Sequence, residues 1–329
     1  MSKNAVMPLI DYKNVCDAIR EKTGSTDLIK SGDMAEKIMG ISEDSGINYD
    51  LLWDTFQNNG ERTSYECAFS ATAFRWTDEI YNPKYPIVCN GDTVNTAYKT
   101  FYNCAIADTK VPITIEGTRF DNTFQYCVNL KRIPSLTLNN LTRIQNPFQN
   151  CKALEELNMH GEINVDGLNL SYSPLLTHDS LMSVINSLKD FSTTIVDNAV
   201  VTVNKQSHYF ISSGNITEDK DYVVEFTIAN TGVTYSGIYK PVYNETSQRY
   251  ELSVFTPYPE TKPPVAYDRI YNDGENLMLA VGFNFNSDVN ITIKELSDET
   301  HTVTFGETNL AKLTDGEKLQ ATKKGWVLQ

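Results

Sequence analysis

The sequence predicts a β-rich protein of the α+β class. It combines a short solenoid of stacked repeats, a helical segment before it and an inserted antiparallel β-sandwich-like module. Three observations predict this fold: a Phe–Cys motif that recurs at fixed spacing, helical patterns near both ends, and a late region in which apolar and polar residues alternate. The 329 residues suffice for two or three domains with a sizeable core.

Residues 1–48 are expected to form a helical segment for attachment or oligomerisation, followed by a linker. In "LIDYKNVCDAIREKTG", Val15, Ala18 and Ile19 fall at helical spacing, and Gly24 favours a helix end. "SGDMAEKIMGI" repeats the pattern, and "SEDSGIN" reads as a polar linker. Because helices this short are marginal alone, we expect them to pack together or against another subunit.

Residues 49–175 are predicted to form the solenoid. Each repeat places a Phe three residues before a Cys, and successive cysteines lie 23 and then 24 residues apart. This period, with one apolar register, lies in the range of leucine-rich repeats. Since one repeat cannot bury its apolar face alone, neighbours should stack around a continuous core. The predicted core residues are Phe101, Cys104, Phe124, Cys127, Leu130, Ile133, Phe148, Cys151, Leu154 and Leu157.

Both ends of a solenoid need residues that shield its core from water. Upstream, residues 64–88 are expected to form a degenerate first coil with Phe74 in the Phe position. Downstream, residues 176–203 and 302–329 are predicted to form a C-terminal cap. The cap should contain a helix whose apolar stripe is Leu181, Val184, Ile185 and Leu188, with Thr177 or Asp179 as its N-cap. A second helix should start at a capping box of Thr314 and Glu317 and end before Gly325.

Residues 204–301 differ from the solenoid in their periodicity. "YVVEFTIAN", "RYELSVF", "NLMLAVGFNF" and "DVNITIKEL" alternate with period two and are separated by Gly, Asn, Asp and Pro. Such runs are typical of antiparallel strands, so this region is predicted to be a β-sandwich-like module inserted between the two halves of the cap.

The cysteines are the first candidates for chemistry. No C-x₂-C spacing occurs, and His160, His178, His208 and His301 are scattered, so we expect no metal site and no cofactor. One Cys per coil at a fixed phase should form a column of small buried side chains. We therefore predict that Cys104, Cys127 and Cys151 are reduced, buried and stacked.

The tyrosines of the inserted module are the second candidates. Tyr presents a flat apolar face with a hydroxyl at its edge, which suits sugar rings. Tyr222 and Tyr250 lie within the alternation and are expected in the core, although strands also favour Tyr for structural reasons. The tyrosines in turns or strand ends are expected to be exposed and to bind glycan: Tyr235, Tyr239, Tyr243, Tyr258, Tyr267 and Tyr271.

Charge and motif content narrow the function classes. The formal net charge of −14 disfavours binding to nucleic acid or to an anionic membrane surface. The nucleophile-elbow, P-loop and dinucleotide-binding motifs are missing, so we do not expect an enzyme. A glycosidase needs only two suitably spaced carboxylates, and among the 42 Asp and Glu residues such a pair stays an open alternative.

The repeat coils and three further stretches resemble known proteins. The F-x-x-C-x-x-L coils resemble BspA-type leucine-rich repeats. "CDAIREKTGSTDLIKSGDMAEKI", "LWDTFQNNGERTSYECAF" and "TNLAKLTDGEKLQATKKGWVL" are similar to segments of minor structural and tail proteins from phages and prophages of Gram-positive bacteria. The resemblance covers residues 1–200 and 303–329, whereas the module at 204–301 departs from it.

The resemblance implies a component of a phage tail, baseplate or fibre. We therefore expect a non-catalytic protein that binds a host cell-wall glycan, contacts other tail proteins and forms a homo-oligomer, with a trimer as the first guess. It would be made in the host cytoplasm and carried in the virion, which fits an N-terminus without a secretory signal. The alternatives are a glycan depolymerase on the tail and a bacterial surface adhesin with the same repeats.

Overall fold

The computed structural model describes residues 17, 49–70, 81–91, 93–204, 208–253, 267–281 and 287–329. They belong to two compact units. The solenoid unit contains the described residues up to Lys189, together with 302–313 and 328–329; the sandwich unit contains 190–301 and 314–327. The predicted helical segment 1–48 lies outside the described residues, apart from the helical Asp17.

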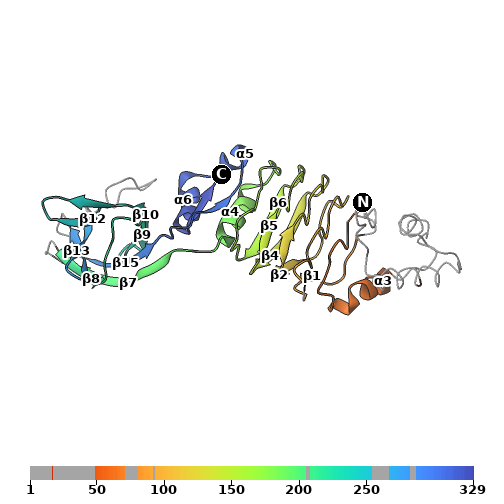
Figure 1. Cartoon of the computed structure of the whole chain (residues 1–329), viewed down its shortest axis with the longest axis horizontal. Helices are drawn as coiled ribbons and strands as arrows, with labels where there is room; N and C mark the ends of the chain where they lie inside the picture. The colour runs from red at the N-terminus through yellow and green to blue at the C-terminus, as the bar shows by residue number, and fades with distance from the viewer. Residues whose placement is uncertain are drawn as a thin grey trace. The chain divides into compact units, whose positions relative to one another are not determined.

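The solenoid unit is built from coils that stack through parallel strands (Figure 1). Its main sheet has the order β1–β2–β4–β6, and β3 and β5 form a second parallel pair. These strands are β1 (Ile87–Cys89), β2 (Ile113–Glu116), β3 (Arg119–Asp121), β4 (Arg132–Asn139), β5 (Arg143–Gln145) and β6 (Glu156–Gly161). Ile113 pairs with Leu136, which pairs with Met159, so equivalent apolar positions lie in register. The prediction of a β-rich solenoid is confirmed.

A stack of phenylalanine rings runs through the solenoid core. Phe124 lies between Phe101 and Phe148, with ring centroids 5.0 and 5.6 Å away and interplanar angles of 6° and 7°. Phe69 extends the stack, with its centroid 4.9 Å from that of Phe101. Phe69 therefore occupies the Phe position predicted for Phe74, a residue outside the described ones. The first stacked ring therefore lies five residues before the predicted one in the sequence.

In the coils that contain Phe101, Phe124 and Phe148, two turn residues lie in the left-handed backbone region: one stands two positions before the Phe and the other two positions after it. The positions before are Lys99, Asn122 and Asn146, with φ of 52°, 52° and 49°; those after are Asn103, Tyr126 and Asn150, with φ of 54°, 65° and 63°. Asn tolerates this region better than other residues with a Cβ. Cys67, two positions before Phe69, has φ of 54°. The preference explains the four asparagines among these seven residues and leaves Cys67, Lys99 and Tyr126 unexplained by the backbone.

The first coil is covered by α3 (Tyr49–Phe56), which the short 3₁₀ helix η2 (Asn58–Gly60) follows. Trp53 is 3% exposed and packs edge-on against Tyr81, with ring centroids 6.0 Å apart. The buried Gln57 Nε2 donates to the Tyr85 carbonyl at 2.7 Å, and its Oε1 accepts from the Lys84 and Tyr85 amides. These contacts close the apolar core at this end of the described coils.

At the other end, α4 (His178–Ser187) lies along the edge strand β6. The hydroxyls of Ser180 and Ser183 accept from the amides of Leu157 and Met159 at 2.9 and 3.0 Å, so they satisfy the polar edge of the sheet. Thr177 caps the helix, as predicted. The predicted apolar stripe is confirmed too, since all four of its residues are buried: Leu181, Val184, Ile185 and Leu188.

Residues 302–313 also pack in the solenoid unit. They contain α5 (Glu307–Leu310). The buried Asn309 Nδ2 donates to the carbonyls of Leu170, Ser173 and Phe305. Lys312 Nζ donates to the carbonyls of Pro174 and Leu176. This part of the predicted cap therefore joins the coil that precedes α4.

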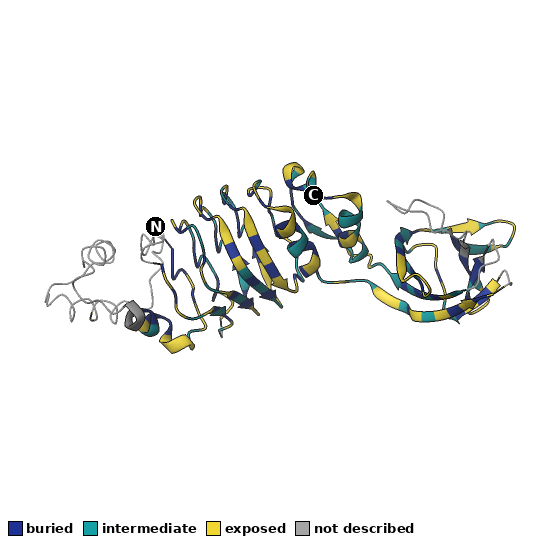
Figure 2. Cartoon of the chain, turned by 180° about the vertical axis from the view of Figure 1, so that it is seen from behind, coloured by how far each residue is buried: buried dark blue, intermediate teal, exposed yellow. Residues whose placement is uncertain are grey.

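The sandwich unit contains two antiparallel sheets whose inner faces share one core. The first has the order β10–β9–β15–β7 and the second β11–β12–β13–β14–β8. The strands are β7 (Thr193–Val203), β8 (His208–Ser213), β9 (Tyr222–Ile228), β10 (Val233–Tyr239), β11 (Pro241–Asn244), β12 (Arg249–Ser253), β13 (Tyr267–Asp273), β14 (Asn276–Val281) and β15 (Ser287–Glu295). Buried and exposed residues alternate along many strands of both units (Figure 2).

The limits of the sandwich unit differ from the predicted 204–301. β7 pairs with β15, so the sheet already begins before residue 204. Helix α6 (Asp315–Lys323) also belongs to this unit, and its predicted capping box of Thr314 and Glu317 is present. Gly325 follows it with φ of 87°, as expected for a helix stop. The short strands β16 (His301–Val303) and β17 (Trp326–Leu328) form a two-stranded sheet.

Candidate functional sites

The Phe–Cys column is structural rather than reactive. All ten residues predicted for the repeat core are at most 2% exposed. Cys127 Sγ donates to the Phe101 carbonyl at 2.8 Å, and Cys151 Sγ donates to the Phe124 carbonyl at 3.0 Å. Each of these thiols thus fills space and also satisfies a carbonyl of the preceding coil. The prediction that Cys104, Cys127 and Cys151 are free and buried is confirmed.

These thiols are expected to react slowly in the native protein. Burial raises the pKa of the Cys151 thiol to about 12 and that of Cys127 well above its ordinary value. Because the thiolate is the nucleophile, we expect an alkylating reagent at pH 8 to modify Cys104, Cys127 and Cys151 at least about 100-fold more slowly than in the denatured chain. Peptide mapping after timed alkylation measures this, and fast modification of all three in native protein would contradict a stacked core.

Three of the six candidate glycan-binding tyrosines are buried, contrary to the sequence-based prediction. Tyr235 and Tyr239 lie on β10, two positions either side of Gly237, and are 9% and 4% exposed because they face the sandwich core. Tyr271, on β13, is 8% exposed; the guanidinium carbon of Arg249 lies 4.7 Å from its ring centroid, and its hydroxyl lies 2.9 Å from His208 Nδ1. None of these three rings can serve as an open platform for a sugar.

Tyr243 is the candidate whose side chain the structure shows exposed, with 48% of its surface accessible. It lies on the edge strand β11 and pairs across the strands with Tyr250, at a ring-centroid distance of 5.2 Å. The Tyr250 hydroxyl donates to the Glu218 carboxylate. Tyr258 and the side chain of Tyr267 lie outside the described residues.

A polar cluster lies at the turn after β11, and the strand register puts its Asn244 and Glu251 on the sheet face opposite Tyr243 and Tyr250. Asn244 Nδ2 donates to Glu251 at 3.0 Å, and the Ser247 hydroxyl donates to the same carboxylate at 2.8 Å. Asn244 Oδ1 also accepts from the Thr246 amide, which shapes the turn after β11. The carboxylate that contacts the tyrosine pair is that of Glu218, through the Tyr250 hydroxyl. An exposed aromatic face beside a carboxylate suits a sugar ring, because the ring stacks while its hydroxyls find a partner.

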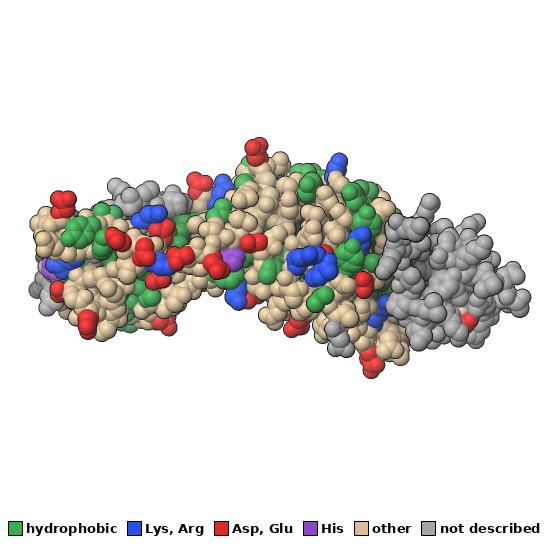
Figure 3. Space-filling view, in the orientation of Figure 1, with side chains coloured by type: hydrophobic (Ala, Val, Ile, Leu, Met, Phe, Trp, Pro, Cys, Tyr) green, Lys and Arg blue, Asp and Glu red, His purple; other side chains and the backbone are tan. Residues whose placement is uncertain are grey.

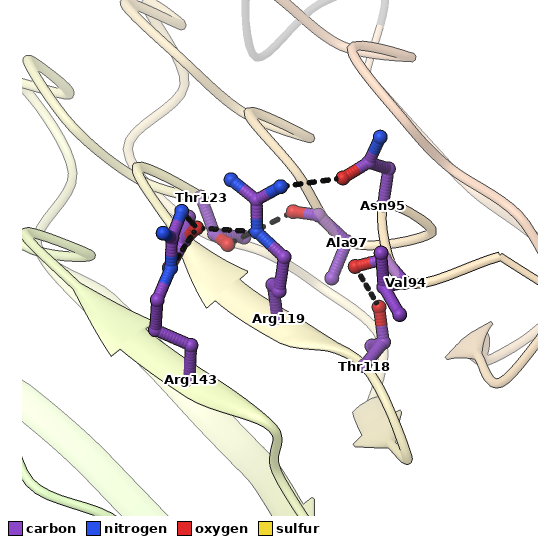
Figure 4. A network of polar contacts seen from close by, with 8 residues as sticks. Val94, Asn95, Ala97, Thr118, Arg119, Thr123 and Arg143 are labelled. Atoms are coloured by element: carbon purple, nitrogen blue, oxygen red, sulfur yellow. Dashed lines mark hydrogen bonds and ion pairs between the residues drawn. The ribbon is translucent and has the colours of Figure 1, made fainter.

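A network of polar contacts occupies the second parallel strand pair of the solenoid (Figure 4). The Asp121 side chain is fully buried and accepts from Arg119 Nε at 2.6 Å and from Arg143 Nε at 2.9 Å. Arg119 Nη1 also donates to Asn95 Oδ1 at 2.9 Å. The hydrogen bond to Asp121 raises the pKa of the Arg143 guanidinium above its usual value. The arrangement holds two guanidinium groups side by side on adjacent coils.

An open hollow of about 530 Å³ lies between β4, β6 and α4, lined by Arg132, Glu155, Glu156, Leu157, Asn158, Thr177, Asp179 and Ser180. Glycosidases need one carboxylic acid that desolvation keeps protonated. Glu155, Glu156 and Asp179 are all exposed, so the hollow offers no desolvated acid.

Among the described residues, no cluster of three or more His, Cys, Asp or Glu could hold a metal ion. Within the same residues, no helix combines the length and apolarity needed to cross a membrane.

Comparison with known proteins adds no relative: no family model, no curated protein and no solved structure matches the chain. Any functional assignment therefore depends on the sites described above and on the resemblance of the repeats.

Proposed function

We propose that the chain is a non-catalytic receptor-binding component of a phage tail or baseplate, and that it binds a glycan of the host cell wall. In this proposal its solenoid is of the leucine-rich-repeat type and acts as a rigid support. The observation that carries the proposal is the exposed Tyr243 ring beside Tyr250 at the edge of the sandwich unit. A stacked sugar would bury the ring face, and nearby side chains would accept its hydroxyl hydrogen bonds.

The proposal is tested by substituting Tyr243 in the full-length chain. We expect Tyr243→Ala to bind about 10-fold more weakly when the protein is co-sedimented with Gram-positive cell walls freed of teichoic acid, because loss of one buried aromatic face removes on the order of 1.5 kcal/mol. Tyr172→Ala is a matched control, since Tyr172 is also exposed but lies in the solenoid unit. Equal binding by the two variants would show that Tyr243 does not contribute to glycan binding.

The remaining parts of the proposal concern the assembly. The chain would contact other tail or baseplate proteins, form a homo-oligomer and be carried in the virion. For this part of the proposal, the parallel coils of the solenoid support only the role of a rigid spacer. Mass spectrometry of purified particles from a phage that encodes the chain tests this part: the proposal predicts its peptides among the tail proteins, and their absence from intact particles would contradict it.

A further inference from the structure

A second group of aromatic side chains lies on the turns of the solenoid, where Tyr126 is exposed and Tyr98 and Tyr102 are half-buried. Lys99 Nζ is 5.2 Å from the ring centroid of Tyr98 and 4.7 Å from that of Tyr102. The Tyr102 ring in turn contacts Tyr126 of the next coil, with centroids 5.7 Å apart and planes at 85°. Arg119 lies over Tyr98, with its guanidinium carbon 5.4 Å from the centroid. We call this set, with the neighbouring Arg143, the aromatic–basic patch: Tyr98, Lys99, Tyr102, Arg119, Tyr126 and Arg143.

Two members of the patch occupy backbone positions that disfavour them. Lys99 has φ of 52° and Tyr126 has φ of 65°, where the equivalent residues of the coils that contain Phe124 and Phe148, or Phe101 and Phe148, are asparagines; in the coil of Phe69 the residue equivalent to Lys99 is Cys67, with φ of 54°. A bulky residue in the left-handed region is strained, and such strain persists where the side chain has another use. Tyr126 is 37% exposed, so burial in the core does not account for its presence. The fold alone would be served better by Asn at both positions.

The part of the solenoid that contains the patch is positively charged, whereas the whole chain is negatively charged. Residues 91–154 contain seven Lys and Arg and four Asp and Glu, whereas the chain carries a formal net charge of −14. Asp121 is fully buried beneath Arg119 and Arg143, while half of the Arg143 side chain is exposed. Figure 3 shows Lys and Arg side chains gathered beside hydrophobic ones on the face of the solenoid that it presents. Cations and aromatic rings therefore share one surface.

We propose that the aromatic–basic patch binds an anionic polysaccharide. The tyrosine rings would stack against the apolar faces of sugar rings, and Lys99 with Arg143 would contact the carboxylate or phosphodiester groups of the polymer. Arg119 and Arg143 occupy paired positions on adjacent coils, so two successive charges of a polymer can meet two guanidinium groups. This site is separate from Tyr243, so the inference does not depend on the function proposed for the sandwich unit.

A nucleic acid fits the patch less well. Proteins that bind single strands present aromatic rings on which successive bases stack. Tyr102 and Tyr126 are perpendicular to each other, so they do not form two successive parallel platforms. The net charge of the whole chain would also oppose a long polyphosphate.

The test uses the full-length chain and a variant that restores the asparagine of the other coils at both positions, Lys99→Asn/Tyr126→Asn. Binding is titrated against hyaluronan, wall teichoic acid, neutral dextran and a 20-nucleotide oligothymidylate. The matched control is Lys131→Asn/Tyr172→Asn, which makes the same chemical changes at exposed residues outside the patch; Tyr172 is 39% exposed against 37% for Tyr126. Lys99→Gln, which leaves every ring in place, tests the charge alone.

We expect the wild-type chain to bind hyaluronan, teichoic acid or both, more weakly as salt increases, and not to bind dextran. Hyaluronan identifies carboxylate recognition and teichoic acid phosphodiester recognition. The double variant should bind at least about 10-fold more weakly, and its melting temperature should equal or exceed that of the wild type. Lys99→Gln should bind several-fold more weakly, and the control within about two-fold of the wild type.

Three results would overturn the inference: no binding of either anionic polysaccharide, preferential binding of the oligothymidylate, or unchanged affinity in both the double variant and Lys99→Gln. Tyr243→Ala should leave these titrations unchanged. A failure at Tyr243 and a failure of the patch can therefore be told apart.

Discussion

Phe124→Ala is expected to lower the free energy of unfolding of the solenoid unit by about 3–5 kcal/mol. The Phe124 ring is fully buried and stacks on Phe101 and Phe148, while Phe120 packs edge-on beside it. Because a solenoid is stabilised largely by the interfaces between neighbouring coils, a cavity at the middle of the stack weakens two interfaces at once.

Equilibrium denaturation monitored by circular dichroism measures this loss. Val128→Ala is the control, since Val128 lies in the same turn but is 52% exposed, and it should change stability by less than about 0.5 kcal/mol. A loss below about 1 kcal/mol for Phe124→Ala would mean that the ring stack does not hold the coils together.

The double substitution Arg119→Gln/Arg143→Gln is expected to destabilise the solenoid unit by about 3–5 kcal/mol, because it leaves the buried Asp121 carboxylate without its cations. Adding Asp121→Asn should restore more than half of the loss by removing the buried charge. Arg132→Gln is the control: Arg132 is 58% exposed and pairs with Asp108 at the surface, where an ion pair contributes about 0–1 kcal/mol. Denaturant melts of the four proteins test this, and a triple variant no more stable than the double would contradict the argument.

The repeat could be predicted from the sequence because its period is nearly constant. A Phe and a Cys recur in phase, and the structure stacks them as expected. The first ring was misplaced for a physical reason. The interval from Phe69 to Phe101 is longer than the repeat, and most of the extra residues precede β1: Ile87 follows Phe69 by 18 residues, whereas its strand partner Ile113 follows Phe101 by 12. A period measured on regular coils cannot predict an insertion in an irregular one.

The strands of the sandwich were predictable from alternation, but the exposure of its tyrosines was not. "YSGIY" places Tyr235, Gly237 and Tyr239 on one face, and this period-two pattern was available in the sequence as a sign of burial. Tyr271 is different, because Arg249 of the adjacent β12 and His208 of β8, two strands away, cover it. Such contacts depend on which strands pair, and this pairing cannot be predicted from the sequence of a single strand.

The aromatic–basic patch was missed because its members look like ordinary turn residues. The signal was present in the columns of the repeat: Asn occupies the positions two before and two after Phe148, while Lys99 and Tyr126 depart from that pattern. Aligning the coils shows the departure, but only the backbone angles show that it is strained. The contact of Tyr102 with Tyr126 across coils also required the structure.

We propose above that the protein binds a wall glycan without cleaving it. The most direct test incubates the full-length chain with purified cell walls and measures, in one sample, the bound protein and the reducing ends released with time. The account predicts saturable binding and no more reducing ends than in a sample without protein. Steady release of reducing ends would indicate a depolymerase, and absence of saturable binding would contradict recognition of the wall altogether.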